Sequence, residues 1–214
     1  FVNSSEEDEV FATLDQIRQR GLPVVELSQN YGVDAVNADY RAATKEVMSY
    51  LFSLGHRRIS MIYGVGGHEL AEDRLQPYRA SLQAAGIPFD ADLVQECGPT
   101  INDGYQAAKR LLELKARPTA IITINDLLAI GALRAAADLK LQVPNDLSLV
   151  GYDNIPMADF LIPRLTTVTK DAYTLGTEAF KMLLARIQNP ELPRQLIQHR
   201  PKLIIRESTG QAPF

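Results

Sequence analysis

Short apolar runs alternate with stretches of helical periodicity through the middle of the chain. Four runs, at 58–63, 93–97, 119–124 and 147–151, are rich in aliphatic residues and have the length of strands. The first three are each followed by a stretch with apolar side chains every three or four positions, as on one face of a helix. Strands with so few polar positions are covered on both faces, so the pattern predicts βαβ units around a parallel sheet.

The two outer parts of the chain predict further elements. A helix capped by Ser4 or Ser5 ends at Gly21, a strand starts at 22–25, and a second helix covers 41–54. An extended connector at 163–168 leads to a helix near 172–188 and a final strand at about 196–205. We assign 1–55 and 170–200 to a first lobe, and 57–168 with 201–209 to a second. The chain then crosses between the lobes more than once.

Composition excludes several classes of protein. The formal net charge of −4 over 214 residues does not provide the basic surface that grips DNA phosphates, so DNA binding would need another part of the protein. No run of about 18 apolar residues predicts a membrane span. Cys97 is the only cysteine, which rules out a disulfide framework and suggests a reducing compartment such as the cytoplasm.

Signatures of catalysis are missing as well. The sequence has no G-x-S-x-G, H-E-x-x-H or C-x-x-C motif, and its three histidines have no metal-ligand spacing. We therefore expect no enzyme activity, no metal and no cofactor.

Polar side chains that follow the predicted strands are the candidate ligand contacts. In open parallel sheets, ligands bind beyond the carboxyl ends of the strands. Arg74 follows the first strand after its loop, Asn125 and Asp126 follow the third, and Asp153 and Asn154 follow the fourth. Such a mixture of donors and acceptors suits a polyhydroxy ligand. Structural roles are the alternatives: a helix cap, which we favour for Asp126, a turn for Asn154, and a surface ion pair for Arg74.

Five ordered segments resemble the LacI/GalR family of transcriptional repressors. They are Leu54-Gly55-His56-Arg57-Arg58-Ile59, Arg117–Ile121 leading to Asn125–Ala132, Val143–Asn154, Pro163–Val168 and Arg206–Thr209. The resemblance implies a two-lobed, periplasmic-binding-protein-like fold that holds a small effector between its lobes. By the same resemblance, Arg74 reaches the effector, Asn125 and Asp153 are polar contacts, and Asp39 lies at the cleft edge.

The resemblance also implies partners. Family members bind operator DNA through an N-terminal helix-turn-helix domain, which we expect to be absent from this chain. They also have two further βα units before the point where this chain starts, so we expect its first lobe to be incomplete. Several relatives place an aromatic ring after the second strand, where this chain has Pro99. Asn125 favours a sugar-like ligand. The alternatives are a periplasmic sugar-binding protein of a transporter and, more distantly, an enzyme on a doubly wound fold.

The helix that starts at Asp126 predicts a subunit contact. Residues 127–133 contain no polar side chain, and a helix that is apolar all round must be covered on both faces. One face packs on the sheet, and we predict that the other meets a second subunit in a homodimer, as the resemblance also implies. The alternative is burial of that face under the connector of the last lobe.

Overall fold

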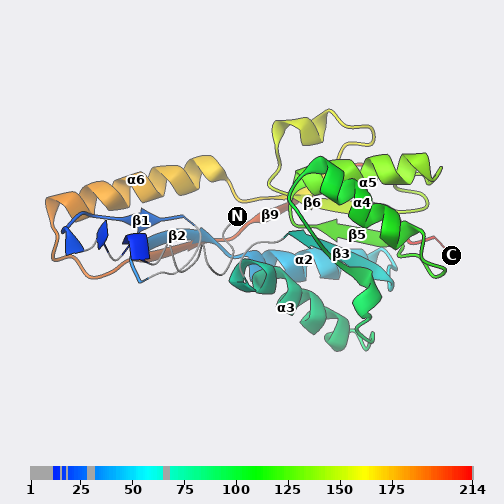
Figure 1. Ribbon diagram of the computed structural model, residues 1–214, viewed down its shortest axis with the longest axis horizontal. Helices are drawn as coiled ribbons and strands as arrows, with labels where there is room; N and C mark the ends of the chain where they lie inside the picture. Colours follow the sequence, from blue (N-terminus) through cyan, green and yellow to red (C-terminus); the bar gives the residue numbers. More distant parts are fainter. Residues whose placement is uncertain (1–11, 15, 18, 28–31, 65–67, 214) are drawn as a thin grey trace.

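Two separate sheets organise the protein, each with its own helices. The computed structural model describes residues 12–14, 16, 17, 19–27, 32–64 and 68–213. A larger lobe contains a six-stranded sheet, and a smaller lobe contains a three-stranded sheet covered by one long helix (Figure 1). The α/β fold predicted from the sequence is confirmed. The cap at Ser4 or Ser5 lies outside the described residues.

The six-stranded sheet forms the centre of the larger lobe. Its first five strands are parallel, and the last pairs antiparallel with its neighbour. In spatial order the strands are β4 (Val94–Cys97), β3 (Ile59–Gly64), β5 (Ala120–Thr123), β6 (Ser148–Tyr152), β7 (Thr166–Thr169) and β9 (Lys202–Ile204).

Helices cover both faces of this sheet, as the apolar strands predict. Helices α4 (Ile101–Leu112) and α5 (Asp126–Asp138) pack on one face, where Ile121 and Leu149 point into their cluster. Helices α2 (Tyr40–Ser53) and α3 (His68–Ala84) pack on the other, around Ile122 and Val150. Successive strand residues therefore enter opposite cores, because side chains alternate across a strand.

The smaller lobe is a parallel sheet of β1 (Val25–Glu26), β2 (Asp34–Ala38) and β8 (Leu196–His199). Helix α6 (Ala172–Gln188) covers one face, and its Leu175, Ala179 and Met182 pack on Val36. Strand β2 was not predicted. The described residues also include two short 3-10 helices, η1 (Ala91–Leu93) and η2 (Pro156–Asp159).

Two boundaries differ from those predicted. Helix α2 was assigned to the first lobe with residues 1–55, but its Val47, Met48 and Leu51 are fully buried against the six-stranded sheet. The segment in the smaller lobe therefore ends near Asp39. The single final strand predicted at 196–205 is two strands in different sheets, β8 and β9, separated by Arg200 and Pro201.

The chain crosses between the lobes at three places. The crossings are β2 to α2 at Asp39, β7 to α6 at 170–171, and β8 to β9 at 200–201. Hydrogen bonds and strand pairing join them side by side: the Asp39 N–H donates to the His199 carbonyl at 2.8 Å, and Thr169 pairs with Lys202. The third crossing thus lies between the other two.

Helix α5 has its second face covered within the same chain. Helix α4 packs on it so closely that a Cβ on Gly131 would overlap the backbone of α4, and one on Gly104 would overlap the backbone of Leu128. Ala132, on the face predicted to meet a second subunit, is fully buried. Ala132 therefore does not itself meet a second subunit. Helix α4 covers this face, and Leu165 of the connector belongs to the same buried cluster, while the homodimer stays a prediction.

The C-terminal segment is fixed to the larger lobe by buried polar groups. The ring of His56 is fully buried, with Nδ1 at 2.9 Å from the Thr119 hydroxyl and Nε2 at 2.9 Å from the Ser148 hydroxyl. Nε2 also lies 3.1 Å from the Gly210 carbonyl, so it donates there when it carries the proton. Burial lowers the pKa of His56, although the Gly210 carbonyl acts in the opposite direction.

Candidate ligand-binding site

Arg74 is the centre of a cluster of aromatic rings at the junction between the lobes. Its side chain is 9% exposed and comes from α3. The guanidinium carbon lies 4.0 Å from the ring centroid of Tyr40, the first residue of α2, and 5.7 Å from that of Tyr152, at the end of β6. The rings hold the cation by their negative faces, so three elements fix the direction of this side chain.

Asp153 joins the cluster through Lys170. The Lys170 ammonium lies 3.3 Å from Asp153 Oδ1 and also interacts with the Tyr40 hydroxyl. Burial lowers the pKa of Lys170, but Tyr40 and Asp153 outweigh it, so the net pKa is raised. Asp153, Lys170, Tyr40 and Arg74 therefore form one connected group drawn from β6, the second crossing, α2 and α3.

The turn after β6 is held in an uncommon conformation. Asp153 and Asn154 have φ values of 100° and 52°, in the region that favours glycine. Asn154 Oδ1 accepts a hydrogen bond of 2.8 Å from Arg206. Gly151 leaves space for Asp126, because a Cβ there would overlap the Asp126 carboxylate. The surrounding contacts thus hold Asp153 at the carboxyl edge of the sheet.

Asp126 is a buried anchor for this turn and not the cap that the sequence favoured. Its carboxylate accepts hydrogen bonds from the Thr167 hydroxyl at 2.6 Å and from the Ile155 N–H at 2.8 Å. Burial raises the pKa of Asp126 to about 6. The residue that caps α5 is Asn125, whose side-chain oxygen accepts from the Leu128 N–H at 2.8 Å.

Asp39 is likewise a helix cap. Its Oδ1 accepts from the Ala42 N–H at 2.9 Å at the start of α2, directly before Tyr40. The structure therefore brings three predicted residues, Arg74, Asp153 and Asp39, to the lobe junction. Asn125 lies on the neighbouring strand end, with its oxygen already engaged.

A cavity of about 430 Å³ opens at this junction, at the carboxyl ends of the small sheet. Asp39, Tyr40 and Lys170 line it together with Asn37 of β2 and Gln198 of β8. Sequence analysis missed Asn37, Tyr40 and Lys170. Tyr40 directly follows the predicted Asp39, and Lys170 directly follows the connector, but their contacts depend on how the two lobes meet.

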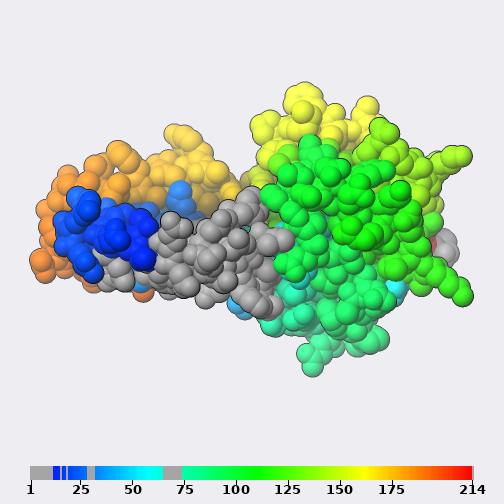
Figure 2. All heavy atoms as spheres, in the orientation of Figure 1, coloured from blue at the N-terminus to red at the C-terminus, as the bar shows by residue number. Residues whose placement is uncertain are grey.

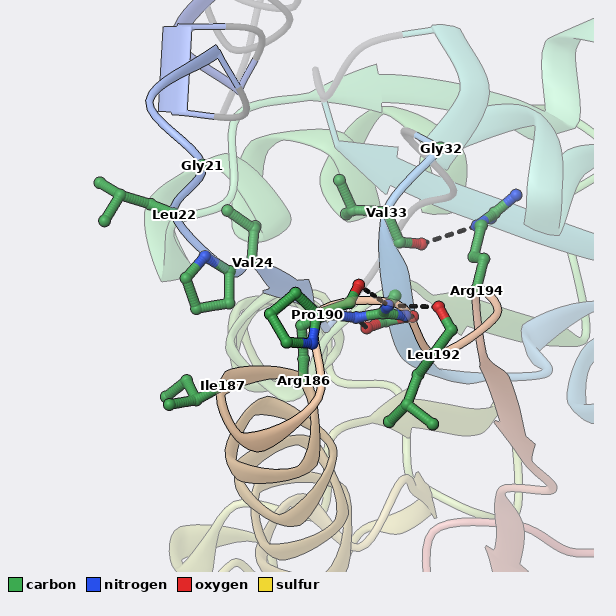
Figure 3. Close-up of a pocket in the computed structure, with 12 residues that line it drawn as sticks. Gly21, Leu22, Val24, Gly32, Val33, Arg186, Ile187, Pro190, Leu192 and Arg194 are labelled. Carbon is green, nitrogen blue, oxygen red and sulfur yellow. Dashed lines mark hydrogen bonds and ion pairs between the residues drawn. The ribbon is translucent and has the colours of Figure 1, made fainter.

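A second cavity, of about 560 Å³, lies at the opposite end of the small sheet (Figure 3). Arg186 reaches into it, but all five of its N–H groups are used. Two donate to Asp34, each at 2.9 Å, and the others to the carbonyls of Pro190, Leu192 and Pro193. This arginine fixes the end of α6 to β2, which leaves it no donor for a ligand. We therefore place the site at the junction.

Comparison with known proteins identifies the family. The periplasmic binding protein-like domain family matches residues 48–209. The chain is 31% identical over 213 residues to the HTH-type transcriptional regulator DegA of Bacillus subtilis, covering 98% of this chain and 63% of that protein. It is 34% identical over 199 residues to the HTH-type transcriptional repressor CytR of Escherichia coli, covering 91% and 58%. The chain thus spans about three fifths of the length of these curated relatives.

Solved structures give the same result. A LacI-family regulatory protein from Chloroflexus aggregans superposes with a TM-score of 0.85 at 31% identity, covering 92% of this chain and 72% of that one. A LacI-family regulator from Enterococcus faecium with bound ribose gives 0.84 at 29%, covering 92% and 74%. A complex of the regulator CelR with cellobiose gives 0.85 at 29%, covering 91% and 61%. The chain belongs to the LacI family of transcriptional regulators and has their periplasmic-binding-protein-like fold.

Two observations bear on other functions. Within the described part of the chain, no helix is both long and apolar enough to cross a membrane. Across the same residues, histidine, cysteine and acidic side chains do not gather into a group that suits a metal ion.

Proposed function

We propose that this chain is the effector-sensing part of a LacI-type repressor and that it binds a sugar-like ligand at the lobe junction. The cluster of Arg74, Tyr40, Lys170 and Asp153 carries the proposal, because it combines cations, a carboxylate and aromatic faces beside a cavity. Sugars present hydroxyl edges and apolar ring faces, and such a cluster can bind both. Two structural relatives are described with ribose and cellobiose.

Regulation of DNA would follow from a shift between lobe arrangements. A ligand that touches Asp153 of the larger lobe and residues around Asp39 at the first crossing favours the arrangement in which both reach it. In the complete protein, which we place in the cytoplasm, that shift would change the spacing of helix-turn-helix domains on operator DNA. We propose no enzyme activity, since the relatives are regulators.

A thermal-shift screen tests the ligand class. D-ribose, cellobiose and a panel of other sugars and nucleosides are added to the intact protein. A ligand at a hundred times its Kd adds about 2.7 kcal/mol of stability, which raises the Tm of a protein of this size by roughly 5–10 °C. We expect at least one sugar to reach that range.

Asp153→Asn tests whether the ligand binds at the proposed place. It removes the carboxylate charge at the junction, and we expect the shift given by the active sugar to disappear. Asp92→Asn, the same change at an exposed residue of η1, should keep the full shift. If no sugar moves the wild-type Tm, the proposed ligand class is wrong. An undiminished shift in Asp153→Asn places the ligand elsewhere.

We also propose a homodimer, through a surface that differs from the one the sequence suggested. Three large apolar side chains project from segment 156–162: Met157 is 54% exposed, Phe160 80% and Ile162 97%. Leu127, 41% exposed, follows Asp126, whose carboxylate accepts a hydrogen bond from the Ile155 N–H just before this segment. Figure 2 shows this segment, in yellow, standing out at the edge of the larger lobe.

A second copy of the chain is the occupant that we propose for this surface. Exposed apolar patches of this kind mark protein contacts, and aromatic anchors contribute most of the binding energy at interfaces. An ion pair of 2.8 Å between Arg206 and Asp159 of η2 joins this segment to the rest of the larger lobe. Phe160→Ser combined with Ile162→Ser should give a folded monomer in analytical ultracentrifugation. A double variant that stays dimeric would show that the subunits meet elsewhere.

A further inference from the structure

Two buried polar atoms at the carboxyl end of the small sheet lack hydrogen-bond partners among the residues that the structure describes. They are Oδ1 of Asn37, on β2, and Nε2 of His199, on the adjacent strand β8. The two strands are in register here, with Ala38 opposite His199. Most buried side-chain polar atoms in proteins are paired, and an unpaired one destabilises the fold. Two such atoms at one sheet end mark a place that can receive further polar groups.

Asn37 is the one of the two that lines the junction cavity. It lies two residues before Asp39 and three before Tyr40, whose ring holds Arg74. Lys170 lines the same cavity and connects it to Asp153 through the 3.3 Å ion pair. A ligand in this cavity would therefore face a free acceptor from the smaller lobe and charged groups linked to the larger one.

We propose that Asn37 determines specificity in the smaller lobe by binding a hydroxyl group of the ligand. This inference rests on the function proposed above and adds the smaller-lobe contact that it lacked. The strand holds Asn37 in place, so the amide selects a ligand hydroxyl at one position. A ligand without a polar group at that position leaves the amide oxygen unpaired and binds more weakly.

A hydroxyl suits this amide better than other ligand groups do. A hydroxyl both donates and accepts, so it pairs with the oxygen of the amide or, after a half-turn of the terminal torsion, with its nitrogen. A carboxylate only accepts, so it could pair with the amide nitrogen after the same half-turn but would give the Asn37 oxygen no donor. The inferred ligand class is therefore a neutral polyhydroxy compound, with Lys170 available to donate to a second oxygen.

Asn37→Leu separates a ligand contact from a structural role. Leucine has the same number and branching of side-chain heavy atoms as asparagine and removes the unpaired oxygen. If the oxygen serves the ligand, its removal should raise the Tm of the unliganded protein by about 2 °C or more. The same variant should bind the active sugar at least about tenfold more weakly in calorimetry. Asn145→Leu, an identical change at an exposed residue of the larger lobe, should leave the affinity unchanged.

The outcomes distinguish this inference from the proposed function. A higher Tm of the unliganded protein together with weaker sugar binding in Asn37→Leu supports the role of Asn37 as a ligand contact. A lower Tm with unchanged affinity makes Asn37 a structural residue and overturns it, as does any result in which the variant binds the sugar as the wild type does. If Asp153→Asn abolishes binding in that case, the proposed function stands alone. If no sugar binds the wild-type protein, both fall together.

Discussion

The contact between Arg74 and Tyr40 supports a quantitative prediction. A cation over an aromatic ring contributes about 0.5–1 kcal/mol at exposed sites and about 2 kcal/mol or more when water is excluded. Arg74 is 9% exposed and its guanidinium lies 4.0 Å from the ring centroid, so this contact is near the upper end. We expect a coupling free energy of about 1–2 kcal/mol between the two side chains.

A double-mutant cycle measures this coupling. Tyr40→Leu, Arg74→Met and the double variant are unfolded in urea and followed by far-UV circular dichroism. The cycle subtracts the other contacts that each side chain makes, including the 6.2 Å approach of the Tyr40 and Tyr152 rings. Tyr40→Phe is the matched control, because it keeps the ring and removes only the hydroxyl, so its cycle with Arg74→Met should give a coupling free energy near zero. A coupling below about 0.3 kcal/mol for Tyr40→Leu is within the error of additivity and would refute the argument.

Three further predictions concern stability. Ala132→Glu should unfold the larger lobe, because it places a carboxylate in the core and lowers the free energy of unfolding by about 3 kcal/mol or more. A variant that is still folded by circular dichroism would contradict the packing of α4 on α5. Asp34→Ala leaves two Arg186 donors unpaired at a buried ion pair. In urea unfolding it should lower the free energy of unfolding by about 3–5 kcal/mol. A loss below about 1 kcal/mol would mean that the ion pair contributes little to stability. Because the pKa of His56 is lowered in the folded protein, its contribution to the free energy of unfolding is complete above about pH 6.5 and is lost as the pH falls below that value. Asp126, with its pKa raised to about 6, acts in the opposite direction between about pH 4 and 6. His56→Gln should therefore flatten the loss of stability at acid pH, and an unchanged pH profile would exclude His56 as its source.

The sequence predicted the larger lobe well because its signals are local. The four strands predicted there are short apolar runs, and the helices after the first three have their own periodicity, so neither signal depends on distant residues. Strand β2, with the sequence Asp-Ala-Val-Asn-Ala, has little strand propensity and gains its place by pairing with β8, far along the chain. The division of 196–205 into β8 and β9 depends in the same way on which sheet each half joins.

The candidate site was predicted in part for a related reason. The rule that ligands bind at strand ends located Arg74 and Asp153, because it needs only the order of strands in one sheet. Tyr40, Lys170 and Asn37 come from the smaller lobe and from the crossings, so their approach depends on how two lobes meet. Asn125 is the cap that was predicted at Asp126, because a cap is defined by backbone angles at one residue, which the sequence does not specify.

The three crossings between the lobes set how the molecule can deform. Hydrogen bonds and strand pairing join the three crossings side by side, with the 200–201 crossing in the middle. They therefore act as one narrow hinge between the lobes and not as three independent linkers. Such a hinge resists stretching and sideways sliding of the lobes, while it yields to a twist about its own length. A small ligand that contacts one edge of this hinge would therefore rotate one lobe relative to the other. That rotation displaces the far ends of the lobes much more than it displaces the residues that bind the ligand.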